Sequence, residues 1–387
     1  RYMSTDAMPR STSTGTSDNS VFGFCMFLGI SATLATGQLF GYLGFVPKLS
    51  EEFGGRVALG LPLFSLGYAF GMILIGSLAA RFGPQKVMIV SLGLGGLVSI
   101  ATAFSTSLPM LLTLRFCEGT ILGGFPPAAF VASAQKIPPK KILFANSAMA
   151  FGLLGSAGVA GLITKIFTIT SNWRTGLIIY GILLLLAGLT AWMQTGLVHA
   201  NPEVGFPYRH FSREIANKEL LFSAFFGAST MAVFVFANST AQRSSVAVAA
   251  LILVAVIVLM ILGLSKRIVT YAIDTRRLAG LGFTLSGLLI LTVWNGALLP
   301  ALCLITIGAT LTIPASIQNV VMNARRVVPV AVALFTCSLF IGGAVVGMSV
   351  TGIVQIQPST VLMVLDCFMV LAFVTAVSRY LRTKTTQ

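Results

Sequence analysis

The sequence predicts an all-α membrane protein with about twelve transmembrane helices. Hydrophobic residues fill 56% of its 387 positions and charged residues only 9%, a balance that soluble and disordered chains do not have. The apolar runs are roughly 20 residues long, as a helix needs to cross a bilayer, and they lack the period-two alternation of transmembrane strands. The net charge of +15 lies mainly in short loops between the runs, so it reflects membrane topology and not a nucleic-acid partner.

The expected spans follow the apolar runs in chain order. Most of the 25 Lys and Arg residues fall on one side of the membrane when the N-terminus is placed in the cytoplasm. The positive-inside rule therefore predicts that both termini are cytoplasmic, with the chain in a plasma membrane, such as a bacterial inner membrane. The predicted spans are 21–46, 57–79, 87–106, 110–134, 142–164, 175–197, 219–238, 246–264, 278–295, 298–322, 329–352 and 359–380.

A long interior polar segment, 198–218, divides these spans into two sets of six. Features also recur six spans apart, because Gly119 precedes Pro126 in the fourth span much as Gly308 precedes Pro314 in the tenth. A duplicated bundle of this kind places substrate near the bilayer midplane, between its halves. We expect a disordered cytoplasmic tail, an N-terminal bundle, a cytoplasmic linker, a C-terminal bundle and a second tail over 1–20, 21–197, 198–218, 219–380 and 381–387.

The fourth span is unusual because it carries charge at membrane depth. Arg115 and Glu118 are three residues apart, so they share one helix face and can form an ion pair. A charge there costs at least ~2.5–3.5 kcal/mol on insertion scales, which favours a functional use. Pro126 and Pro127 follow and should bend the helix. Two interpretations stay open, a permanent structural ion pair and a proton-coupling pair reached from a water-accessible chamber between the halves.

The turn between the second and third spans is small and basic. A tight turn at the inner leaflet explains Gly76, Arg81, Gly83 and Lys86 by itself. The spacing also resembles the Gly-x-Leu-x-Asp-Arg-x-Gly-Arg-Arg/Lys loop of the Major Facilitator Superfamily, which gates the two bundles. Ala80 stands where that family has an aspartate, a residue that helps to latch the bundles on the inside.

Further motifs carry the same resemblance. Arg115-x-x-Glu118-Gly119 is similar to the family's fourth-span signature, whose arginine is associated with proton coupling, and Trp173-Arg174 is similar to a hallmark of span six. The glycine-rich fifth span lies where exporters of the family carry a Gly-Pro motif, but it has no proline. The resemblance implies two six-helix bundles, and its nearest branch is the bacterial drug/proton antiporters that include arabinose-efflux-permease-like proteins.

The resemblance also implies which residues line a central cavity, because spans one, four, seven and ten form its walls in the family. For any single phenylalanine among them, packing against a neighbouring helix is the simpler interpretation. The expected proton-coupling residues are Arg115, Glu118 and Asp366, although span twelve, which carries Asp366, usually lies outside the cavity. The expected substrate-binding residues are Gln38, Tyr42, Arg115, Phe225, Phe226, Ser229, Asn238, Thr310, Gln318 and Asn319.

These observations predict a secondary transporter that works by alternating access. The first hypothesis is a proton-coupled antiporter that exports a small organic molecule or drug. The alternative is uptake or exchange of a small anionic metabolite, with Arg115 as the anion anchor. A third class, a receptor or an enzyme, finds no catalytic, metal-ligating or nucleotide-binding motif in its favour. We expect protons and a small molecule as partners, a lipid bilayer around a monomer, and neither cofactor nor metal.

Overall fold

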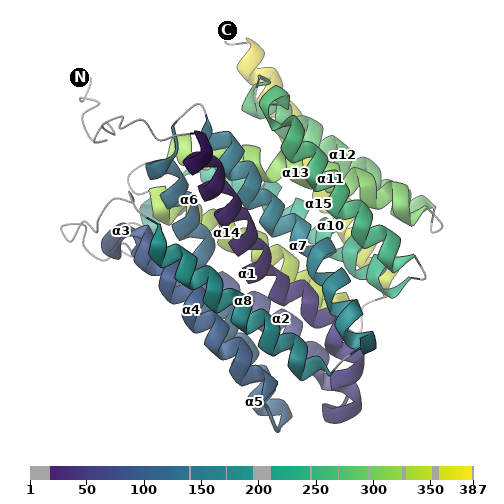
Figure 1. Cartoon of the computed structure of the whole chain (residues 1–387). Coiled ribbons are helices and arrows are strands. Elements are labelled where there is room, and N and C mark those ends of the chain that lie inside the picture. Colours follow the sequence, from purple (N-terminus) through teal and green to yellow (C-terminus); the bar gives the residue numbers. More distant parts are fainter. Residues whose placement is uncertain are drawn as a thin grey trace.

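In the computed structural model every regular element is helical within the described residues, which are 18–138, 141–170, 172–194, 211–244, 246–268, 270–294, 297–324, 328–350 and 357–385. The start of α1 and the end of α15 lie at the same end of the bundle (Figure 1), as an even number of crossings requires. The N-terminal half comprises α1 Asp18–Phe53, η1 Gly55–Leu59, α2 Gly60–Leu74, η2 Gly76–Leu78, α3 Ala79–Phe82, α4 Pro84–Ala103, α5 Leu108–Leu122, α6 Phe125–Lys136, α7 Ile142–Thr170 and α8 Trp173–Met193.

The C-terminal half begins with a short helix, α9, and then continues as a series of long helices, as in the N-terminal half. Residues 195–210, most of the expected linker, lie outside the described residues, as does most of the expected tail 1–20. The expected tail at 381–387 begins within the last helix, which runs to Thr385. The elements of this half are α9 Phe211–Ile215, α10 Lys218–Arg243, α11 Ala247–Ile268, α12 Ile273–Val293, α13 Leu298–Asn323, α14 Val328–Val350 and α15 Pro358–Thr385.

Ten candidate spans in the described part of the chain are long and apolar enough to cross a membrane. The two remaining expected spans are α11, which has a shorter apolar stretch, and the fourth span, which the structure divides into α5 and α6. The fold class predicted from the sequence is therefore confirmed. The expected bend in the fourth span is an interruption at Gly123 and Gly124, so Pro126 and Pro127 fall in the first turn of α6, where a missing N–H costs no helical hydrogen bond.

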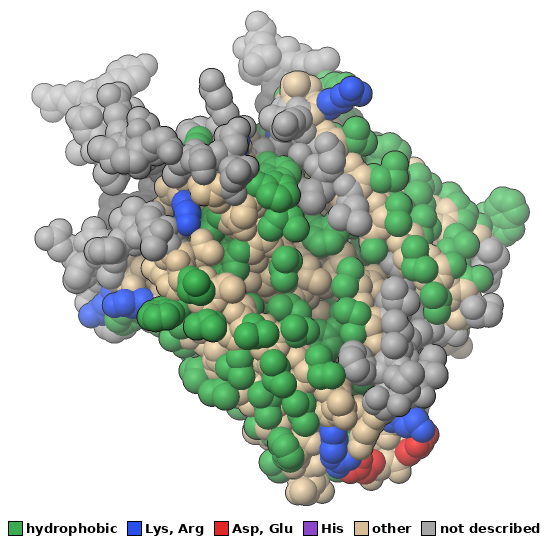
Figure 2. Space-filling model, viewed as in Figure 1, with side chains coloured by type: hydrophobic (Ala, Val, Ile, Leu, Met, Phe, Trp, Pro, Cys, Tyr) green, Lys and Arg blue, Asp and Glu red, His purple; other side chains and the backbone are tan. Residues whose placement is uncertain are grey.

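The outer surface has the polarity of a membrane protein. Figure 2 shows hydrophobic side chains over the middle of one face, with Lys and Arg gathered toward its two ends. Large apolar side chains such as Leu186, Trp192 and Val293 are exposed. Exposure on this scale is stable only where lipid covers the surface.

The same packing pairs recur in the two halves. α1 packs on α7, α2 on α5 and α4 on α8, while in the second half α10 packs on α14, α11 on α13 and α12 on α15. Each of these second-half pairs is its N-terminal counterpart displaced by six spans. The halves meet through α2 with α14 and through α7 with α11, two contacts that are related by the same displacement. The arrangement is that of two structurally repeated bundles.

Within the N-terminal bundle, α2 and α5 approach to backbone contact. A Cβ atom added to Gly71 of α2 would lie 1.8 Å from the carbonyl oxygen of Thr120, and one added to Gly119 of α5 would lie 2.2 Å from that of Phe64. Gly67 and Gly123 are equally confined. Both helices thus carry a Gly-x-x-x-Gly face, which allows close packing between membrane helices. This approach fixes the α2 side chains that lie beside α5.

The basic turn after α2 depends on one left-handed residue. Gly83 has φ 88° and ends α3 directly before α4 begins at Pro84, a conformation that side chains with a Cβ rarely adopt. Gly76 is confined differently, because an added Cβ would lie 2.6 Å from Cγ of Pro127. The glycines of the expected gating loop therefore have local structural roles.

Replacing Gly71 with alanine should destabilise the protein by about 3 kcal/mol or more, since overpacking against backbone cannot be relieved by a side-chain rotation. Gly93→Ala in α4 is the matched control, because an added Cβ there meets nothing within 4 Å and alanine favours the helix. Thermal unfolding in detergent compares the two. A Gly71→Ala protein as stable as Gly93→Ala would contradict the described α2–α5 contact.

Candidate functional site

Arg115 and Glu118 form an ion pair in the interior of the N-terminal bundle. Arg115 Nη1 donates to Glu118 Oε2 at 2.7 Å, and neither side chain has any exposed surface. Arg115 Nη2 donates to the backbone carbonyl of Gln38 on α1 at 2.9 Å. Two charges buried in this way stabilise each other only while both are present, because either alone keeps its full desolvation cost.

Aromatic rings cover the Arg115 guanidinium on two sides. Its Cζ atom lies 4.5 Å from the ring centroid of Tyr42 on α1 and 4.4 Å from that of Phe64 on α2. Ring faces attract a cation and do so more strongly where water is excluded. The Tyr42 hydroxyl donates to the Val57 carbonyl at 2.7 Å, which holds its ring in place. Phe64 owes its position to the close approach of α2 and α5.

The pair keeps unused hydrogen-bonding capacity. Among the described residues, neither Glu118 Oε1 nor Arg115 Nε has a hydrogen-bond partner. Ser99 of α4 lies beside Glu118, but its hydroxyl donates to the Leu177 carbonyl at 3.1 Å and accepts from Gln38 Nε2 at 2.8 Å. Its proton is therefore committed elsewhere. Glu118 Oε1 is consequently the position at which this site can accept a proton without first losing a hydrogen bond.

The expected water-accessible chamber at Arg115 is wrong for this conformation. The guanidinium lies between Tyr42 and Phe64 and has no exposed surface. Its charge is met by Glu118, by a backbone carbonyl and by ring faces in place of water. Access of any ligand to Arg115 therefore requires a rearrangement of the side chains that enclose it.

The other predicted substrate residues do not gather around this pair. Phe225 of α10 packs against Phe368 of α15 at 6.4 Å between ring centroids, and Phe226 and Ser229 are buried. Asn238 Nδ2 donates to the Phe234 carbonyl one turn earlier, and the Thr310 hydroxyl likewise donates to the Thr306 carbonyl. Gln38 and Tyr42 are the members of the set that contact Arg115.

Gln318 and Asn319 belong to a separate polar cluster in the C-terminal bundle. Gln318 accepts from Arg276 at 2.8 Å, and Asn319 donates to Glu219 at 3.2 Å. Glu219 also pairs with Arg379 of α15. Arg277 is 2% exposed, donates to Ser223 and pairs with Asp274 at 3.6 Å. The cluster joins α10, α12, α13 and α15.

Sequence analysis named Gln318 and Asn319 but not the charged residues around them. Their one visible signal was the paired arginines 276 and 277 at the start of a span, preceded by Asp274. Hydropathy separates the spans from the loops between them. Only the folded chain, however, brings Glu219 and Arg379, which are 160 positions apart, into contact.

Asp366 lies away from the Arg115 pair, between α15 and α12. Its Oδ2 accepts from the Thr292 hydroxyl at 2.8 Å, and its neighbours Met363, Val364 and Phe368 are exposed on the lipid-facing side of α15. The structure thus places it on an outer seam of the C-terminal bundle. Its expected part in proton coupling stays a prediction.

Two contacts hold the ends of the N-terminal bundle. At one end Trp173 Nε1 donates to Glu52 at 3.1 Å and Arg174 pairs with the same carboxylate, which joins α8 to α1. At the other end Gln85 donates to the carbonyls of Ala191, Trp192 and Gln194 at the end of α8. In the basic turn, Arg81 lies 5.5 Å from the Phe82 ring and Lys86 is exposed. The Trp173-Arg174 motif therefore binds the carboxylate of Glu52, a residue to which sequence analysis assigned no role.

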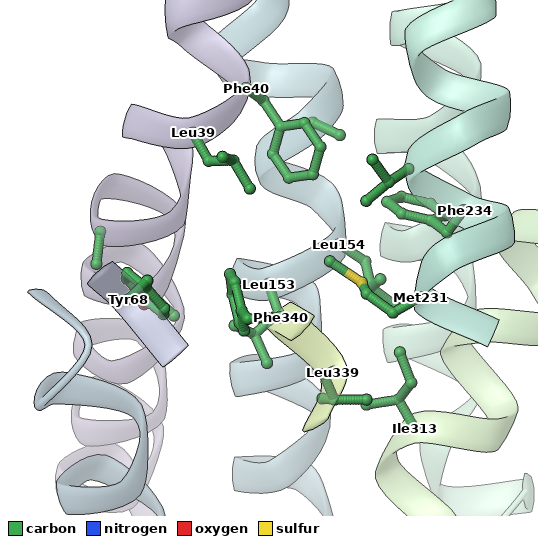
Figure 3. Packing of buried hydrophobic residues seen from close by; sticks show 14 of the residues in the cluster. Leu39, Phe40, Tyr68, Leu153, Leu154, Met231, Phe234, Ile313, Leu339 and Phe340 are labelled. Carbon is green, nitrogen blue, oxygen red and sulfur yellow. The ribbon is translucent and has the colours of Figure 1, made fainter. Parts of the chain in front are cut away.

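Apolar side chains from both halves meet at the centre of the molecule. Figure 3 labels residues of the first half, which are Leu39 and Phe40 of α1, Tyr68 of α2, and Leu153 and Leu154 of α7. Among them lie residues of the second half, which are Met231 and Phe234 of α10, Ile313 of α13, and Leu339 and Phe340 of α14. All ten are buried. In this conformation the inner faces of the two bundles are closed on each other by hydrophobic contact.

Repeated helical bundles that meet through an apolar, aromatic face are the architecture of many secondary transporters. A family model described as the Major Facilitator Superfamily matches residues 24–382. The chain belongs to this superfamily. It is accordingly a multi-pass membrane protein of that superfamily.

Known transporters of organic acids are similar to part of the chain. The 4-hydroxybenzoate transporter PcaK of Pseudomonas putida is 36% identical over 153 residues, 38% of this chain and 34% of that protein. The probable sulfoacetate transporter SauU of Cupriavidus necator is 32% identical over 139 residues, 35% of this chain and 32% of that protein. The gallate transporter of Pseudomonas putida is 29% identical over 157 residues, 39% and 35% of the two chains. The matches span about a third of these relatives' length.

Removing either member of the buried pair should cost about 3–5 kcal/mol of stability, because the remaining charge is left uncompensated. We expect Arg115→Met and Glu118→Leu each to lower the unfolding temperature strongly. The double variant should be much closer to wild type, since no buried charge remains. Chemical unfolding of all four proteins gives the coupling energy, and additive losses would show that the two groups do not interact.

Proposed function

We propose that this protein takes up a small organic anion, with Arg115 as the anion anchor and protons as the coupling ion. The observation that carries the proposal is the buried Arg115–Glu118 pair, which holds the guanidinium and one free carboxylate oxygen together. The proposal also draws on the organic acids in the names of the similar transporters. These relatives favour the anionic-metabolite hypothesis over export of a drug.

In this scheme the substrate anion and the Glu118 carboxylate compete for the Arg115 guanidinium, and protonation of Glu118 favours the anion. Glu118 Oε2 accepts from Arg115 Nη1. A proton on Glu118 neutralises the acceptor and weakens the pair, so the guanidinium becomes available to a carboxylate of the substrate. The buried site then holds one cation and one anion again, which avoids an uncompensated charge. Substrate and proton thereby enter the occupied state together and travel in the same direction.

Import is the direction that we propose. The fifth span, α7, lacks the proline of the exporter motif that its glycines otherwise resemble, and no similar transporter described above is named for drug efflux. We further propose that the protein works as a monomer in a bacterial inner membrane with both termini in the cytoplasm. An Escherichia coli relative, 28% identical over 169 residues, is named an inner membrane transport protein.

Uptake into proteoliposomes tests the proposal. The protein is reconstituted, a gradient with an acidic exterior is imposed, and entry of labelled 4-hydroxybenzoate, gallate and sulfoacetate is followed. We expect accumulation of at least one of these anions and its loss when the gradient is collapsed. Glu118→Gln should abolish accumulation driven by the pH gradient, while counterflow of the anion without a gradient continues.

A matched control is Glu51→Gln, since Glu51 is an exposed carboxylate near the end of α1 that pairs with Lys48 and lies outside the Arg115–Glu118 site. Its pH-driven uptake should stay within about twofold of wild type. If Glu118→Gln accumulates anion with the wild-type pH dependence, the coupling role is refuted. If a cationic drug is extruded and none of the anions enters, the antiport hypothesis replaces this one.

A further inference from the structure

An aromatic pair bridges the two bundles near the centre of the molecule. The rings of Tyr68 on α2 and Phe340 on α14 lie 4.4 Å apart between centroids, and their side chains are 0% and 2% exposed. Figure 3 shows the two residues on facing helices within the apolar interface. Any movement that separates α2 from α14 must therefore pull these rings apart.

The Tyr68 ring also belongs to a column of aromatic rings that starts at the guanidinium of Arg115. Arg115 lies 4.4 Å from the Phe64 centroid, and Phe64 stacks on Tyr68 at 5.6 Å. Tyr68 then meets Phe340 at 4.4 Å. The column therefore joins the buried cation of the first bundle to the surface of the second. An aromatic carboxylate has a complementary arrangement, because it carries a negative charge at one end, opposite in sign to Arg115, and a flat ring beyond it.

Two hydroxyls beside this column lack a well-formed hydrogen bond within the described part of the chain. The Tyr68 hydroxyl lies close to that of Thr36 on α1, and among the described residues neither has a hydrogen bond of normal geometry. Both residues are 0% exposed. A buried hydroxyl that lacks a hydrogen bond destabilises the folded protein, so this arrangement carries a free-energy penalty. A polar group placed between them would satisfy both at once.

Building on the function proposed above, we propose that Tyr68, Thr36 and Phe340 form a subsite for the ring of a hydroxylated aromatic carboxylate. When the bundles part, the substrate's ring replaces the contact between Tyr68 and Phe340. The two hydroxyls then bond a ring hydroxyl, which can donate to one and accept from the other. A site that pairs a substrate hydroxyl discriminates against the analogue without it, since the protein's own polar groups would stay unpaired.

Equilibrium binding to the purified full-length protein tests the subsite. The probes are 4-hydroxybenzoate, benzoate and sulfoacetate, and their dissociation constants are measured calorimetrically at one pH. We expect wild type to bind 4-hydroxybenzoate about tenfold more tightly than benzoate, which corresponds to ~1.4 kcal/mol. In Tyr68→Phe this ratio should fall to about one. Phe340→Leu should weaken both aromatic acids relative to sulfoacetate.

Phe335→Leu is the matched control, because Phe335 is a buried ring on the same helix that lies against Gly227 of α10. Its ligand preferences should equal those of wild type. A Tyr68→Phe protein that keeps the tenfold ratio, or a wild type that binds sulfoacetate and neither aromatic acid, overturns the subsite alone. A wild type that binds none of the three anions overturns the proposed function itself.

Discussion

An arginine inside an apolar helical bundle must have its charge met by the protein, and the N-terminal half is arranged around that requirement. Glu118 supplies the opposite charge, α1 supplies a carbonyl, and two rings cover the guanidinium. These partners come from α1, α2 and α5, so satisfying one side chain ties three helices together. The same arrangement makes the site sensitive, because a single proton on Glu118 changes the balance of charge throughout it.

Close packing of α2 against α5 gives this site its second property. The Gly-x-x-x-Gly faces bring the two backbones together, which places Phe64 on the guanidinium and Tyr68 beyond it. Tyr68 also contacts Phe340 of the other bundle. One row of packed rings therefore connects the ion pair of Arg115 and Glu118 to the contact between the two bundles. A transporter needs such a link, because coupling requires that the occupied site and the conformation depend on each other.

The fold was predictable to the extent that it depends on local sequence. Apolar runs of bilayer length located the spans, and the i,i+3 spacing identified the ion pair of Arg115 with Glu118. Hydropathy predicts the membrane span and not the whole helix, since α1 continues through Glu51 and Glu52 to Phe53, beyond the predicted end of the span at 46. The two differ because helix formation tolerates charged residues that a membrane interior does not.

The surroundings of the site were harder to predict, because they depend on contacts between distant segments. Tyr42 was among the predicted residues, but Phe64 and Tyr68 were not, although the glycines that position them are visible at 67 and 71. Whether water reaches Arg115 depends on how the bundles close, which no single span encodes. The pairing of Glu219 with Arg379 is equally a product of the assembled fold.

The central claim is that Glu118 takes up a proton when an anion occupies Arg115. Infrared difference spectroscopy on the reconstituted protein, recorded on adding 4-hydroxybenzoate, measures this directly through the carbonyl stretch of a protonated carboxylic acid. The account predicts that this band appears on binding and that Glu118→Gln removes it. A spectrum in which ligand binds and no carboxylic acid band changes would contradict it.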